Sequence, residues 1–191
     1  MKTAVMYNSD GMITGVRSGS LRGVLIDAEA SGQNYLLTEA DVDIDRFYVN
    51  IEASDIVEYP EKPSAAHVFN FASRVWELDL TEARAIAWNR IKRDRSAEEF
   101  GTFVWSDHTF DCDEVSQRRI QGAVQLALID DSLSIVWTLA DNTTQTFTAS
   151  ELKQIGQALS NHVKDCHDRG RILRGQIDAA TTEEDLEAIV W

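Results

Sequence analysis

Short apolar runs separated by turn-forming residues fill the first third of the chain. Runs of this length, bounded by glycine, serine, asparagine and aspartate, are typical of strands. The segment Asn8-Ser9-Asp10-Gly11 predicts the clearest hairpin, because an Asp-Gly pair tolerates positive φ at low cost. We therefore expect a small β-rich domain with a meander over residues 1–57, with strands at 4–7, 12–16, 23–26, 34–37 and 47–51.

The chain's two prolines, Pro60 and Pro63, stand close together where this pattern ends. Proline lacks a backbone donor and restricts the residue before it, so this stretch resists both helix and central strand. Residues 66–70 and 74–78 then read as a short hairpin. We therefore expect residues 58–78 to form a proline-containing linker with a hairpin, and the domain boundary to lie between about Val57 and Ser64.

From Asp79 onward the apolar positions recur at helical spacing. A capping residue followed three positions later by glutamate marks a helix start, because the two side chains can satisfy free amides at the first turn. The first helix should run to about Phe100 and stop at Gly101, and the third should cover about 150–178. The capping pairs are Asp79 with Glu82, Asp111 with Glu114, Thr148 with Glu151, and Thr181 with Glu184.

Two hairpins interrupt these helices and resemble one another. Each has a tryptophan in its first strand and a phenylalanine in its second, followed by a helix with an Ile-x-x-Ala or Ile-Gly-x-Ala segment. The aromatic pair would cover the following helix, so we expect Trp105, Phe110, Trp137 and Phe147 in the core. The predicted fold class is α+β: a β-rich N-terminal domain, then a mostly helical domain over residues 79–191 with two hairpin–helix units.

The composition is that of a globular chain with a large acidic excess. Lys and Arg total 18 against 32 Asp and Glu, which gives a net charge of -14. This charge opposes sequence-independent binding to nucleic acid or to an anionic membrane surface. The N-terminus lacks the apolar core of a signal peptide, and no stretch approaches the roughly 20 apolar residues of a membrane span. We therefore expect neither nucleic-acid binding nor membrane insertion.

Cysteines and histidines offer the best candidate metal ligands. His108 and Cys112 are spaced like His162 and Cys166, which His167 follows directly, and the two pairs could in principle form a tetrahedral zinc site. The compact Cys-x-x-Cys knuckles of intracellular zinc sites are absent, which favours buried thiols beside polar histidines. The sequence therefore predicts no metal and no cofactor.

The sequence also lacks a catalytic motif. Cys166 and His167 are adjacent, and neighbours on a helix point about 100° apart, so they cannot form the directed pair of a cysteine nucleophile and its base. A glycan-cleaving enzyme would need two carboxylates across a cleft, and the many acids give no way to choose a pair. A non-enzymatic protein is the resulting expectation.

The long predicted helix changes character along its length. Its first half has a plainly apolar stripe, whereas the second half mixes apolar, small and polar residues. At about 1.5 Å per residue this helix is roughly 40–45 Å long, which exceeds the diameter of a domain of about 100 residues. We therefore predict that the second half is a surface for docking or self-association. Alternatively, the first helix, with Ile86 and Ile91, covers it within the same chain. The interface candidates are His162, Cys166, Leu173, Arg174 and Ile177.

Several sequence blocks occur in a recognisable order along residues 80–180. They include Trp88-Asn89-Arg90-Ile91-Lys92, Phe103-Val104-Trp105, Phe110-Asp111-Cys112-Asp113, Val136-Trp137-Thr138-Leu139-Ala140-Asp141-Asn142 and Cys166-His167. In these blocks the chain resembles a phage-encoded domain-of-unknown-function family found in tail-fibre and tail-assembly proteins. The segment from Pro60 to Trp76 also looks like the joint before such C-terminal domains in phage tail proteins.

The resemblance implies a role in the tail of a bacteriophage or prophage, and it carries over no catalytic residue. Our first expectation is a structural protein of the virion tail, associated with the baseplate or tail fibre and made in the host bacterial cytoplasm. It would be oligomeric in that setting and would dock other tail, baseplate or fibre proteins. The alternative is a tail-fibre assembly chaperone that is absent from the mature virion.

Overall fold

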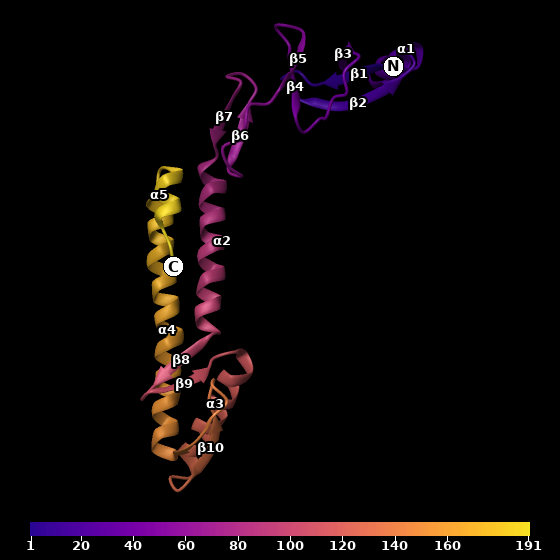
Figure 1. The fold of residues 1–191 in the computed structure, drawn as a ribbon. Helices are drawn as coiled ribbons and strands as arrows, with labels where there is room; N and C mark the ends of the chain where they lie inside the picture. Colours follow the sequence, from indigo (N-terminus) through magenta and orange to yellow (C-terminus); the bar gives the residue numbers. More distant parts are fainter. The chain divides into compact units, whose positions relative to one another are not determined.

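The computed structural model describes residues 1–191 and divides the chain into two compact units, Met1–Asp79 and Leu80–Trp191 (Figure 1). The first unit is rich in strands, and the second is mostly helical with two β-hairpins, so the predicted α+β class is confirmed. The division groups the proline segment and the hairpin after it with the first unit. The predicted boundary between Val57 and Ser64 thus falls inside that unit.

A three-stranded antiparallel sheet with the order β2-β1-β3 organises the first part of the N-terminal unit. Its elements are β1 (Lys2–Tyr7), β2 (Ile13–Gly19), α1 (Leu21–Ser31) and β3 (Asn34–Thr38). Successive side chains of a strand point to opposite faces. Ala4 and Met6 accordingly pack against α1, whereas Val5 packs on the other face with Val42 and Val49.

Residues 23–26 lie in helix α1, so the strand predicted there is wrong. Ser20 caps the helix by accepting a hydrogen bond from the Gly23 amide, and Gly32 ends it with a left-handed φ of 68°. Val24 and Ala28, one turn apart, provide the buried stripe. A short apolar run is compatible with either a strand or a helix. Here the flanking residues favour a helix, because Ser20 can cap its start and Gly32 can end it.

Two hairpins of the same design complete the N-terminal unit. The first pairs β4 (Phe47–Asn50) with β5 (Asp55–Glu58), and the second pairs β6 (His67–Asn70) with β7 (Val75–Leu78). The second was predicted, whereas β5 was not. In each loop the asparagine that ends the first strand accepts backbone hydrogen bonds through its side chain, and the last loop residue, Ser54 or Arg74, has a positive φ.

The long helix α4 (Ala149–Ala179) is the central element of the C-terminal unit, and two other helices pack against it (Figure 1). Helix α3 (Glu114–Ile129) packs along its first half, and α2 (Leu80–Glu99) packs along its second half beside the short α5 (Glu183–Ala188). The hairpins β8 (Thr102–Trp105) with β9 (His108–Asp111), and β10 (Ser134–Thr138) with β11 (Thr144–Thr148), precede α3 and α4. None of the helices combines the length and apolar composition that a membrane span requires.

The predicted helix starts lie close to the observed ones, but two of the predicted capping residues are displaced by one or two positions. Thr148 and Glu151 form the predicted capping box of α4. Helix α3 is capped by Asp113 instead of Asp111, because strand β9 continues through Asp111, which pairs with Thr102. Helix α5 is capped by Thr182 with Asp185, one residue beyond the predicted pair.

Candidate functional site

The two C-terminal hairpins interlock through the four aromatic residues that were predicted as core. Trp105 of the first hairpin contacts Phe147 of the second, with ring centroids 5.9 Å apart. Phe110 of the first hairpin contacts Trp137 of the second at 6.5 Å. Both phenylalanines are fully buried, whereas both tryptophans are half-buried at the edge of the cluster. The aromatic residues of the repeat thus cover one another as well as the helices.

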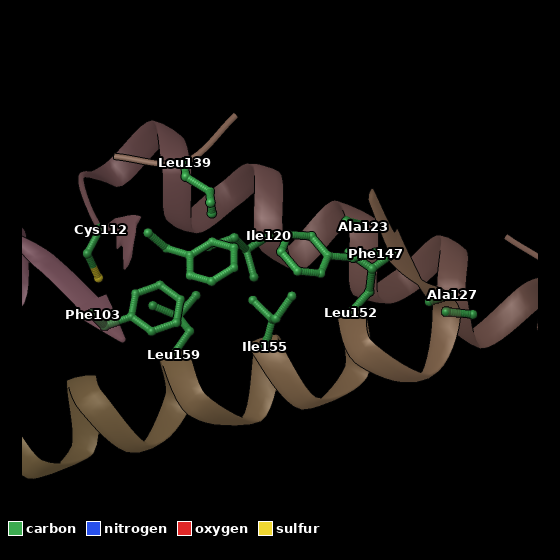
Figure 2. Close-up of a cluster of buried hydrophobic side chains, with 12 residues drawn as sticks. Phe103, Cys112, Ile120, Ala123, Ala127, Leu139, Phe147, Leu152, Ile155 and Leu159 are labelled. Atoms are coloured by element: carbon green, nitrogen blue, oxygen red, sulfur yellow. The ribbon is translucent and has the colours of Figure 1, made fainter. Parts of the chain in front are cut away.

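Phe110 and Phe147 belong to the main core, which lies between α3 and the first half of α4 (Figure 2). Ile120 and Ala123 of α3 face Leu152, Ile155 and Leu159 of α4. Gly156 lets the helices approach closely, since a Cβ at this position would stand 2.5 Å from Cγ2 of Val124. This half of α4 is therefore rigidly packed.

The second half of α4 is covered within the chain, so its prediction as a docking surface is wrong. Cys166, Leu173 and Ile177 are all buried. Helix α2 presents Ala83, Ala87 and Ile91 at helical spacing, and small residues allow the close approach that buries the stripe. The intrachain alternative therefore holds, although Ile86 stays 42% exposed and only Ile91 of its two named residues takes part.

The polar interface candidates are also held by contacts inside the unit. Nε2 of His162 lies 3.1 Å from the carbonyl oxygen of Glu98 at the end of α2. The guanidinium of Arg174 lies 5.2 Å from the ring centroid of Trp88, and its Nε donates to Asp178. Both side chains thus help to fasten α2 to α4.

Arginines of α2 also hold the C-terminal segment. Arg90 donates through Nη2 to the carbonyl oxygens of Leu186 and Ile189, both at 2.8 Å, and so satisfies free acceptors at the end of α5. Arg84 donates to the carbonyl oxygen of Ala180 just beyond α4, also at 2.8 Å. The basic residues of α2 are therefore used largely for internal contacts.

A buried carboxylate that the sequence did not indicate lies between α2 and α4. Glu99 is 9% exposed, with Nε2 of His167 at 3.3 Å and Nε of Arg95 at 3.9 Å. Both thiols are buried as well: burial raises the pKa of Cys112 to about 11 and also raises the pKa of Cys166. A raised pKa keeps a thiol protonated and weakly nucleophilic at neutral pH.

The two His/Cys pairs do not form the four-ligand arrangement that the zinc hypothesis required. No three His, Cys, Asp or Glu side chains are placed so that they could hold a metal ion. His108 instead lies with its ring centroid 5.5 Å from that of Phe147. Cys112 accepts a hydrogen bond from the Gln117 amide at 3.6 Å.

A groove of about 710 Å³ lies between α3 and α4. Helix α3 contributes Gln117, Gln121 and Gln125, which follow one another at one-turn intervals. Helix α4 contributes a polar row that begins at Lys153 and ends at Lys164. Val124, Leu159 and Val163 also line it, and sequence reasoning gave no sign of this surface because it needs two helices side by side.

An aromatic cluster joins the two hairpins of the N-terminal unit. Phe69 is its centre, with the rings of Tyr59, Tyr48, Phe71 and Trp76 at 4.7, 5.0, 5.2 and 5.3 Å between centroids. The Trp76 indole also donates to the carbonyl oxygen of Pro60 at 2.8 Å. These contacts tie the proline segment to the second hairpin.

Comparison with known proteins adds the family of the C-terminal unit. No curated protein and no solved structure matches the chain. Residues 82–190, which cover the α2-to-α5 unit almost completely, match the domain of unknown function DUF4376. The match spans more than half of the chain, and we conclude that this protein belongs to the DUF4376 family.

Proposed function

We propose that this protein is a non-enzymatic structural component of a bacteriophage or prophage tail, associated with the baseplate or the tail fibre, where it docks other tail proteins. The observation that carries the proposal is the ordered set of sequence blocks along residues 80–180, which resembles domains of tail-fibre and tail-assembly proteins. The division into two compact units supports it, because separate units can serve separate partners.

Exposed apolar side chains on the helical unit are compatible with docking. Val104 and Val136 lie on the outward faces of the two hairpins and are 66% and 67% exposed. Leu128 and Ile129, at the end of α3, are 68% and 83% exposed. Exposed apolar surface of this kind often marks a protein-binding site when it is contiguous.

The second candidate is a tail-fibre assembly chaperone, which the strong acidity of the chain favours. A net charge of -14 keeps a free protein soluble and suppresses non-specific association. An assembly chaperone leaves its client before the particle matures, so it must stay soluble as a free protein.

Mass spectrometry of purified particles from a host that carries the gene tests both candidates. A structural tail protein would be found in mature particles at a constant ratio to a known tail protein. A chaperone would be absent from them but would co-purify with the fibre from lysates. If the chain is found in neither sample, and deleting its gene leaves particle yield and tail length unchanged, the tail assignment fails.

A further inference from the structure

The groove of about 710 Å³ between α3 and α4 is unusual for this chain in its charge. Although Asp and Glu total 32 in the sequence, no carboxylate lines this groove. Its polar lining consists of glutamines, a serine and the two lysines at its ends. Each lysine makes an exposed ion pair on its outer side, Lys153 with Asp131 and Lys164 with Asp168, both at 2.7 Å.

On the α3 side this surface continues from a glutamine to two apolar residues. Gln121, Val124 and Leu128 lie on one face of α3, since they are spaced by three and four residues. Leu128, near the C-terminal end of α3 and beyond the groove lining, is 68% exposed. Because Gly156 lets α3 and α4 pack closely, the surface is formed before any partner arrives.

We propose that this α3–α4 surface is where two copies of the chain associate, with the helix pairs of the two copies packed face to face. Two properties favour a second copy as the occupant. A glutamine amide both donates and accepts hydrogen bonds, so a row of glutamines is complementary to an identical row. In a chain with a net charge of -14, a surface without carboxylates adds no acidic repulsion between two copies, and its two lysines, Lys153 and Lys164, are each neutralised by a paired aspartate.

The size of the surface sets the expected strength of association. Helix α3 has 16 residues and is therefore roughly 24 Å long, and two packed helices present a face roughly 20 Å wide. Two such faces would bury on the order of 1,000 Å², which is at the low end of specific interfaces. We therefore expect a reversible dimer, not a permanent one, and its population should rise with protein concentration.

Sedimentation equilibrium of the full-length protein over a wide concentration range tests the dimer. The double variant Gln121→Glu, Gln125→Glu adds carboxylates to the surface of both copies with little change in shape, and both glutamines are exposed, so folding should be unaffected. We expect its dissociation constant to rise at least tenfold. The matched control is Gln145→Glu, Gln176→Glu, which adds the same charge at exposed positions outside the groove and should associate like the wild type.

A further variant separates lost contact from added charge. Leu128→Ala removes exposed apolar surface from the C-terminal end of the α3 face without changing the charge, and it should also weaken the dimer. Circular dichroism confirms that each variant is folded. The proposal is overturned if the wild type stays monomeric throughout the range, or if the Gln121/Gln125 variant associates as strongly as the control. Because only purified protein is used, the result does not depend on the proposed tail function.

Discussion

At the scale of single residues, Phe110 and Phe147 dominate the packing of the helical unit, because each contacts the other hairpin's tryptophan as well as the helices. Replacing either by alanine should lower the free energy of unfolding of this unit by about 3–5 kcal/mol. Val136→Ala is the control, since this side chain is 67% exposed and its loss should cost no more than about 0.5 kcal/mol. Urea unfolding followed by circular dichroism measures both, and similar effects of the two substitutions would contradict the core role.

Cys112 should make stability sensitive to alkaline pH. Its folded-state pKa of about 11 lies above the ordinary value of 9.0, so the unfolded chain loses the thiol proton first. The contribution is therefore complete below about pH 9 and is lost as pH rises through about 11. The loss should amount to roughly 2–3 kcal/mol.

Cys112→Ala provides the comparison for this pH dependence. The variant should be less stable than the wild type at neutral pH because of the cavity, but its stability should decline less between pH 9 and pH 11. Denaturant unfolding under reducing conditions measures both curves. Parallel curves for the two proteins would show that the thiol is not responsible.

Residue-level reasoning from sequence succeeded where the environment follows from local pattern. Phe110 and Phe147 are the only large apolar residues of their strands, which marks them as the positions that face inward. The burial of Glu99 could not be predicted in this way. Its position depends on His167, which is distant in sequence and belongs to another helix.

At the scale of elements, the caps fix where helices begin. Asp113 accepts hydrogen bonds from the amides of Val115 and Ser116, at 2.8 and 3.1 Å, so Asp113→Ala should cost about 1 kcal/mol of stability. Asp111→Ala, two residues earlier in strand β9, should cost less because that side chain caps no helix. Thermal unfolding of both variants distinguishes them, and the reverse order of stability would place the cap at Asp111.

Helix α5 should depend on Arg90 for its order, because a helix of six residues is not stable by itself. Arg90→Met keeps much of the aliphatic length but removes the hydrogen bonds to the carbonyl groups of Leu186 and Ile189. We expect faster amide hydrogen exchange in residues 183–191, with little change in α3. Arg93→Met is the matched control on α2, since the Arg93 side chain is 73% exposed. Unchanged exchange in α5 after Arg90→Met would contradict this anchoring role.

The two main errors at this scale have different physical origins. Residues 23–26 were assigned to a strand because a short apolar run carries no reliable period, and the cap at Ser20 was the better signal. The exposure of the second half of α4 was misjudged because burial there depends on a distant helix. The alanines of α2 are compatible with solvent when α2 is considered alone, and only the pairing with α4 buries them.

At the scale of the whole molecule, each unit has its own hydrophobic core, which predicts two separable unfolding events. The helical unit encloses the cluster around Phe110, and the N-terminal unit encloses smaller clusters around Val5 and Ala4. The larger core should give the higher transition temperature, since a small domain buries a smaller fraction of its surface. Differential scanning calorimetry should therefore resolve two transitions in the full-length protein.

Substitutions in each core assign these transitions to the units. Phe110→Ala should lower the transition of the helical unit alone, and Val5→Ala should lower the other alone, because both residues are fully or nearly fully buried in separate clusters. Residues 80–191 produced as a fragment should retain the transition that Phe110→Ala shifts. This fragment contains the complete α3–α4 surface, so it should also form the proposed dimer. A single transition that both substitutions shift equally would mean that the units unfold as one, and the separate docking roles proposed for them would lose their basis.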